Sequence, residues 1–301
     1  MTTFTLAHLS DVHFPPLPAV RLRELANKRV LGYLNWIKNR HAIHRREVLD
    51  GLVADLKAHA PDQIAVTGDL VNLALEQEYA PVARWLTEVG TPDQLTVVPG
   101  NHDAYVLATQ HRFAESFGDY LRGDDYDGVP EFPFVRRRGP LALIALSSAV
   151  PTAPLLATGR LGAAQLAALE RMLAQLAGET LFRVVLIHHP PTAKSRQKWL
   201  SDASQLLALL RRYGVELVLH GHDHVHSTVW VEGPQAPIPV VGVPSASALP
   251  HGHHPGAAYN LFAIERDNDT WRCTHTVRGY RDALSITELR HGQLAPPQHL
   301  Y

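Results

Sequence analysis

The sequence predicts an α/β (α+β) fold in which layers of helix and sheet pack against one another. Three observations support this prediction. Short aliphatic runs alternate with helical stripes as far as residue 224, and strand-like runs then follow one another with almost no helix between them. In addition, 46% of the 301 residues are hydrophobic, which is enough to fill a large core.

Six buried strands are expected before residue 224, because each is a β-branched or aliphatic run bounded by turn residues. They are Phe4–Leu9, Gln63–Val66, Leu95–Val98, Leu141–Leu146, Arg183–Ile187 and Val215–Leu219. Five further strands are expected after it, namely Val225–Val231, Pro239–Val243, Asn260–Glu265, Trp271–Thr276 and Ser285–Arg290.

Three helices are expected from apolar side chains that recur at helical spacing. Their stripes are Val48, Leu49, Leu52, Val53 and Leu56; Leu166, Leu169, Met172, Leu173 and Leu176; and Leu206, Leu207, Leu210 and Tyr213. Each stripe is interpreted as core packing.

A basic segment interrupts this pattern between the first strand and the first core helix. Residues 21–46 carry eight Lys or Arg and a single acid, Glu24, interleaved with Tyr33 and Trp36. We interpret residues 15–46 as a helical insert or cap within a single domain that spans residues 1–301. Four roles stay open for the insert: helices packed with their basic face in water, a cap that contacts substrate, a surface for anionic lipid, or a dimer contact.

The overall composition excludes several classes of protein. The net charge is −1 and the pI is about 7, so no stable nucleic acid partner is expected. Cys273 is the only cysteine, which excludes an internal disulfide and a thiolate metal cluster. The sequence has no signal-like or membrane-spanning stretch. We therefore expect a cytoplasmic protein, peripheral to the membrane if the insert binds lipid, and a homo-oligomer is not excluded.

Polar motifs directly follow five of the predicted strands. They are Asp11-Val-His13, Gly68-Asp69, Gly100-Asn101-His102-Asp103, His188-His189-Pro190 and Gly221-His222-Asp223-His224. Loops at the carboxyl ends of strands line one edge of an α/β sheet, so these motifs should converge. Carboxylate, amide and imidazole ligands without thiolate suit Mn, Fe, Co or Zn. One motif alone would be an ordinary loop, whereas the ordered set predicts a metal site.

The five motifs resemble the ordered signature of the calcineurin-like metallophosphoesterase superfamily, from Asp11 to His224. Within it, the chain is most similar to class III cyclic-nucleotide phosphodiesterases. The resemblance implies a four-layer αββα sandwich. It also implies two divalent or mixed-valence transition metal ions that share Asp69. Asp11, His13 and His224 would complete the first site, and Asn101, His188 and His222 the second.

The resemblance implies that His102 is the catalytic residue and faces the phosphate, where it would hydrogen-bond the substrate oxygen or protonate the leaving group. Two cations about 3.5–4 Å apart would hold a bridging hydroxide and neutralise the phosphoryl oxygens. The chain departs from the protein phosphatases of the superfamily because Asn72 stands where they place an aspartate that orients the histidine. Asp103 is a candidate substitute, and His189 a candidate neighbour of the metal ligands.

Three other sets of polar residues are given structural roles. His8 is expected to be a core histidine, and Arg136–Arg138 a solvated strand end. For His251, His253 and His254, a solvated loop is favoured over a rim around the pocket.

The sequence thus predicts a dinuclear metal-dependent phosphoesterase whose substrate is a small-molecule phosphodiester, with a cyclic nucleotide as the first candidate. Alternatives within the same chemistry are a lipid-headgroup or glycerophosphodiester phosphoesterase, a phosphomonoesterase and a nuclease. A non-catalytic metal-bound scaffold is a remote alternative, because all seven ligands and His102 are present.

Overall fold

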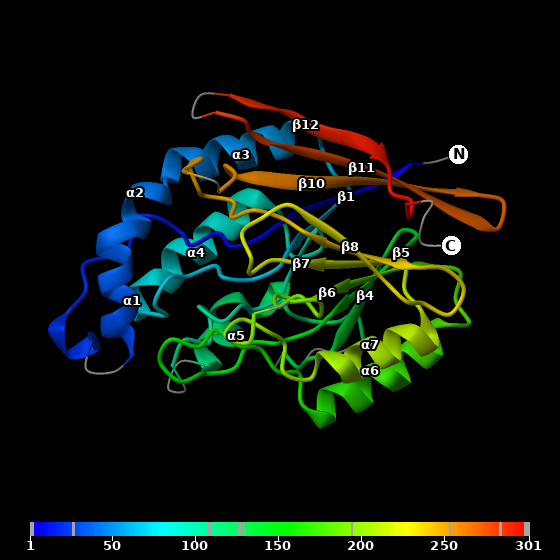
Figure 1. Ribbon diagram of the computed structural model, residues 1–301, viewed down its shortest axis with the longest axis horizontal. Coiled ribbons are helices and arrows are strands. Elements are labelled where there is room, and N and C mark those ends of the chain that lie inside the picture. Colours follow the sequence, from blue (N-terminus) through cyan, green and yellow to red (C-terminus); the bar gives the residue numbers. More distant parts are fainter. Residues whose placement is uncertain are drawn as a thin grey trace.

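The computed structural model describes residues 3–25, 28–106, 110–125, 128, 130–193, 195–252, 254–282 and 285–297. Two six-stranded sheets pack face to face, and helices cover their outer faces (Figure 1). This arrangement confirms the predicted layered α/β sandwich. Among the described helices, none has the length and apolarity needed to cross a bilayer.

The first sheet has the order β12-β11-β10-β1-β2-β3. Its strands are β1 (Phe4–Leu9), β2 (Gln63–Val66), β3 (Leu95–Val97), β10 (Ala258–Asp267), β11 (Thr270–Tyr280) and β12 (Ile286–Gln293). β1, β2 and β3 are parallel, whereas β10 lies antiparallel beside β1. The loops after β1, β2 and β3 therefore open at the same edge.

The second sheet has the order β4-β5-β6-β7-β9-β8. Its strands are β4 (Phe134–Arg138), β5 (Leu141–Ala145), β6 (Phe182–Leu186), β7 (Leu217–His220), β8 (Ser227–Val231) and β9 (Ile238–Gly242). Side chains along its central strands alternate between two cores. Leu143 faces the first sheet and Ile144 faces the outer helices, which explains why these strands are apolar throughout.

The three predicted helices are present as α3 (Arg46–Ala58), α6 (Ala163–Leu176) and α7 (Ala203–Tyr213). α3 contacts β10 and β12 of the first sheet, and α6 and α7 cover the second (Figure 1). The sequence analysis did not predict α4 (Glu76–Val89), α5 (Gln110–Phe117), the short η4 (Gly118–Tyr120) or β4. Pro81 lies inside α4, so the usual signal for a helix break is overridden there by the burial of Val82, Trp85 and Leu86.

The predicted insert is helical. It consists of η1 (Leu22–Leu25), α1 (Arg29–Asn35), the π-helical turn η2 (Trp36–Arg40) and α2 (His41–Ile43). It projects at one end of the sandwich (Figure 1). The Arg29 guanidinium is buried and donates to the carbonyl oxygens of Leu73 and Ala74. The insert is therefore anchored to the loop that follows Asp69.

Candidate metal centre

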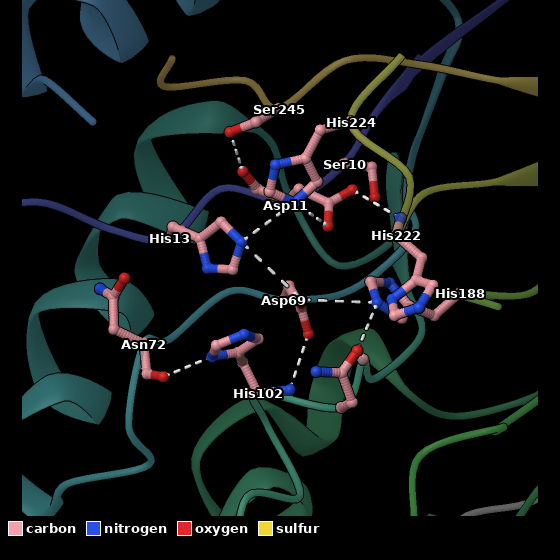
Figure 2. Close-up of polar contacts among 12 residues, drawn as sticks. Ser10, Asp11, His13, Asp69, Asn72, His102, His188, His222, His224 and Ser245 are labelled. Atoms are coloured by element: carbon pink, nitrogen blue, oxygen red, sulfur yellow. Dashed lines mark hydrogen bonds and ion pairs between the residues drawn. The ribbon is translucent and has the colours of Figure 1, made fainter. Parts of the chain in front are cut away.

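The five polar motifs meet at the carboxyl-terminal edge of the two sheets (Figure 2). Those from β1, β2 and β3 come from the first sheet, and those from β6 and β7 come from the second. The loop after β1 is held by both sheets: the Asp11 N–H donates to the Gly68 carbonyl after β2, and Ser245 Oγ, after β9, donates to the Asp11 carbonyl. Residues more than 200 positions apart are thereby fixed in one site.

The backbone at this edge is strained. Five of the nine non-glycine residues with positive φ in the described chain are candidate metal ligands, namely Asp11, His13, Asp69, His222 and His224, with φ between 39° and 72°. Such conformations cost free energy and persist where the surrounding structure requires them. A Cβ at position 100 would collide with Asp69 Oδ1, so Gly100 allows close approach of two ligand loops.

The first group of candidate ligands contains Asp11, His13 and His224. His224 Nε2 lies 3.0 Å from Asp11 Oδ1 and 3.3 Å from His13 Nε2. The ligand atoms of these three residues lie within 4.8 Å of one another. The arrangement points two imidazole nitrogens and a carboxylate oxygen at one position.

The second group is built around Asp69 and His188. His188 Nε2 lies 3.4 Å from Asp69 Oδ2 and 3.2 Å from Asn101 Oδ1, and the His188 and His222 ring centroids are 5.1 Å apart. Asp69 also lies 3.8 Å from His13 Nε2, so this carboxylate faces both groups. The structure therefore brings together all seven residues predicted as metal ligands.

The donors present fit a metal cation. Nε2 of His222, although buried, has no hydrogen-bond partner. His188 Nδ1 donates to the Thr67 carbonyl at 2.7 Å, which leaves Nε2 free to face the site, as is usual for a ligating histidine. Against the effect of burial, the Asp69 carboxylate raises the pKa of His188 to about 10, which shows how strongly this position attracts positive charge. A metal cation would supply that charge in place of the imidazole proton.

His102 is held by a backbone carbonyl. Its Nδ1 donates to the carbonyl oxygen of Asn72, and its own N–H donates to Asp69 Oδ1 at 2.8 Å. The Asn72 side chain points elsewhere and donates to the Phe14 carbonyl. The missing aspartate at position 72 is thus replaced by a main-chain acceptor.

Asp103 does not orient His102, and the prediction of that role is wrong. Its two carboxylate oxygens accept from the backbone N–H groups of Leu70, Val71 and Gly100. Because these groups lie in the two loops that carry Asp69 and Asn101, Asp103 ties those loops together.

Two further predictions about histidines had different outcomes. His8 is fully buried and bonded to Thr67 and Asn260, as expected of a core histidine. His251 and His254 are exposed, but they border the cavity with stacked rings, so the rim is correct and the purely solvated loop is not. His253 lies outside the described residues.

The prediction that Arg136–Arg138 is a solvated strand end is wrong for Arg136. This side chain is 3% exposed and donates to the carbonyls of Arg122, Pro92, Leu95 and Asp119. The sequence hides this role because the acceptors are main-chain atoms of distant loops.

His189 lies beside the metal ligands. Its ring centroid is 4.4 Å from that of His222, and its Nδ1 contacts Ser148 Oγ at 2.8 Å. His188, His189 and His222 form a third group whose ligand atoms come within 4.8 Å of one another. His189 could therefore support His222 or contribute a ligand itself.

Sequence analysis missed two site residues that come from the insert. Arg40 Nη1 lies 3.2 Å from His102 Nε2. His44 packs against His13 with ring centroids 4.9 Å apart and contacts Ser247 Oγ at 2.8 Å. No motif marks either residue, because each reaches the site through the path of the insert. Of the four roles left open for the insert, its contact with the site supports the cap.

These residues surround a cavity of about 290 Å³. Its walls come from the insert, the metal-ligand loops, the Ala157 and Lys198 segments and the His251–Pro255 loop. The cavity thus places a basic group, Arg40, and His102 beside the candidate metal ligands.

A family model described as calcineurin-like phosphoesterase matches residues 4–226. The chain belongs to this family. The match covers all five motifs of the site. The resemblance of the five motifs to this family is therefore confirmed.

Relatives of this calcineurin-like phosphoesterase agree with the fold. A dimetal phosphatase from Danio rerio superposes with a TM-score of 0.62 and 14% identity, over 96% of this chain and 99% of that one. The purple acid phosphatase PPD1 of Lupinus luteus superposes with a TM-score of 0.61 and 12% identity, over 95% of this chain and 53% of that one.

A protein of Synechococcus sp. named probable cyclic nucleotide phosphodiesterase is 29% identical over 175 residues. The aligned region covers 56% of this chain and 60% of that relative.

Proposed function

We propose that this phosphoesterase hydrolyses a phosphodiester, with a cyclic nucleotide as the first candidate substrate. The observation that carries the proposal is the convergence of the seven candidate ligand side chains on one site, beside a cavity that His102 and Arg40 help to line. The name of the Synechococcus relative supports the cyclic nucleotide.

Divalent cations bound by the two ligand groups would supply Lewis-acid activation of water and of the phosphoryl group. Asp11, His13 and His224 would hold one cation. Asn101, His188 and His222 would hold the other, and Asp69 would face both. In the overall reaction, the hydroxyl of water joins phosphorus, the P–O bond of the ester breaks, and a proton goes to the leaving oxygen.

The chain's own groups manage the charge and the proton. Arg40 can donate to a phosphoryl oxygen from the position where it now contacts His102. Because Nδ1 of His102 already donates to the Asn72 carbonyl, the ring can protonate a leaving oxygen from Nε2 only as an imidazolium. Burial lowers the pKa of His102 to about 4, and a bound phosphate anion would raise it again.

The test is metal-reconstituted hydrolysis of bis-aryl and mono-aryl phosphates, 3′,5′- and 2′,3′-cyclic nucleotides and glycerophosphodiesters. His102→Ala and Asp69→Ala are the control variants. Diesterase activity that both variants lose supports the proposal, and the preferred substrate defines the subclass. Folded, metal-loaded protein that cleaves only monoesters, or nothing in the panel, would contradict it.

A lipid-headgroup phosphodiester is the second candidate. The observation that favours it is the exposed apolar and basic surface around the mouth of the cavity, which is developed below.

A further inference from the structure

Exposed apolar side chains gather on the segments that line the candidate catalytic cavity. Nine large apolar side chains are exposed in the described part of the chain. Four of them, Val30, Leu31, Leu34 and Ile37, lie on α1 and η2. Three more, Leu155, Leu156 and Trp199, lie on the segments that adjoin Ala157 and Lys198 in the cavity wall. Exposed apolar surface of this kind marks an interaction site.

The insert and the 151–157 segment lie side by side. Lys28 Nζ donates to the Thr152 carbonyl at 3.0 Å, and Leu31, Leu155 and Leu156 line one small hollow. Asn101, a candidate metal ligand, borders both this hollow and the catalytic cavity. The apolar surface is therefore continuous with the site of chemistry.

The same helical segment divides its side chains between the cavity and solvent. Asn35 and Asn39 line the catalytic cavity, while Leu34 and Ile37, a few positions away, are 53% and 49% exposed. Trp36 is buried and Arg29 is anchored, so the segment has a fixed orientation. A helix that buries one face and still shows leucine and isoleucine to water is typical of an interfacial helix.

The charge of this surface has one sign. Residues 28–46, 151–160 and 190–201 contain no Asp or Glu, although the whole chain has a net charge of −1. Lys38, Arg196 and Lys198 are exposed among the apolar side chains. Cations interleaved with apolar groups complement an anionic lipid surface. An acidic protein partner would need a surface that is both acidic and apolar, in order to match the cations and the leucines together.

We propose that the mouth of the cavity docks on an anionic lipid surface and receives a phosphodiester that is part of a lipid headgroup. Leu34, Ile37, Leu155 and Trp199 enter the interface, and the lysines and arginines contact the anionic headgroups. The cavity of about 290 Å³ accepts the headgroup, while the acyl chains stay in the bilayer. The choice of substrate rests on the proposed phosphodiesterase function, whereas the docking surface does not.

Docking is tested by flotation of the full chain with vesicles of phosphatidylcholine alone and of phosphatidylcholine with phosphatidylglycerol. We expect binding only to the anionic vesicles, and weaker binding in high salt because the charge attraction is screened. The double variant Leu34→Glu/Ile37→Glu should reduce binding at least about tenfold. Val229→Glu, at a valine that is 42% exposed on β8, is the matched control and should bind normally.

Absence of binding to anionic vesicles would overturn the proposal, as would equal binding by the double variant. The proposal would also be overturned if the wild-type protein is a dimer in sedimentation equilibrium and the double variant is a monomer. This face would then belong to the contact with a second copy of the chain.

Hydrolysis separates the two proposals. On metal-loaded protein, the double variant should lower the rate on phosphatidylglycerol vesicles at least about tenfold and leave the rate on a soluble aryl phosphodiester within about twofold. A deacylated headgroup cleaved as fast as the vesicle lipid would overturn the lipid substrate. Vesicle binding without hydrolysis of any phosphodiester would instead contradict the proposed function.

Discussion

The two ends of the parallel strands hold their polar groups in different ways. At the amino-terminal end, Arg136 donates to four backbone carbonyls, and Arg183 forms a two-pronged ion pair with Glu216, with N···O distances of 3.0 and 2.8 Å. At the carboxyl-terminal end, buried nitrogens of His13 and His222 lack partners.

The backbone conformation also distinguishes the carboxyl-terminal end of the strands. Five candidate ligands at the carboxyl-terminal end have positive φ. Buried polar groups without partners cost free energy, and so does a left-handed conformation at Asp or His. The comparison teaches that Arg136 stabilises the packing at the amino-terminal end, whereas the strained ligand residues at the carboxyl-terminal end are preorganised for cations and phosphate.

The largest effect should come from Asp69→Asn, because this carboxylate faces both ligand groups. We expect hydrolysis of an aryl phosphodiester to fall more than about 100-fold, and the rise in Tm on adding Mn²⁺ to the metal-free protein to disappear. Thermal unfolding with and without metal, together with bound-metal analysis, measures both. Asp50→Asn, at an exposed carboxylate paired with Arg46, is the control. If the variant keeps its activity and both metals, Asp69 is not a ligand of the metal centre.

Arg136→Met tests the hydrogen bonds at the amino-terminal end of the strands. The change removes the hydrogen bonds of a buried guanidinium to four main-chain carbonyls, including the carbonyl of buried Leu95, so the free energy of unfolding should fall by about 3 kcal/mol. Urea unfolding measures this loss, and kcat of the folded fraction should stay within about twofold. Full stability, or a selective loss of kcat, would break the division between the two ends.

Arg40→Ala should lower kcat/KM by about 10- to 100-fold, because the guanidinium faces the phosphate position beside His102. Arg40→Lys should recover part of the loss, since lysine keeps the charge without the planar fork. Steady-state kinetics and the affinity for inorganic phosphate are the measurements. Arg45→Ala, at an exposed arginine paired with Glu47, is the control and should behave as wild type. Unchanged phosphate affinity and kcat/KM for the Arg40 variants would place Arg40 outside the site.

The smallest effect is expected from Asn72→Asp, although this residue corresponds to a functional aspartate in the protein phosphatases of the superfamily. Because the main-chain carbonyl holds His102 and the side chain bonds elsewhere, kcat/KM should change less than about fivefold. A pH–rate profile would reveal a direct carboxylate–imidazole pair as a raised pKa for His102. Such a shift would show that the side chain can turn toward the ring.

Much of this protein could be predicted from the sequence. All strands except β4 were found to within a few residues, the central ones because strands buried on both faces are apolar throughout. The seven ligand candidates were found because each follows directly on such a strand, and family membership confirmed the five motifs. These are local signals, in which residue type and strand end stand next to each other in the chain.

Other features depend on contacts between distant segments, and only the tertiary structure decided them. Asp103 could not be assigned to the loop backbones, nor Arg136 to buried carbonyls, because their partners are main-chain atoms, which are the same for every residue type. Arg40 and His44 reach the site because the insert folds back toward it. The exposed leucines indicate a docking surface only because they lie near the cavity. Sequence determined the ligand residues and the family of the chain, and packing decided which basic groups lie beside those ligands.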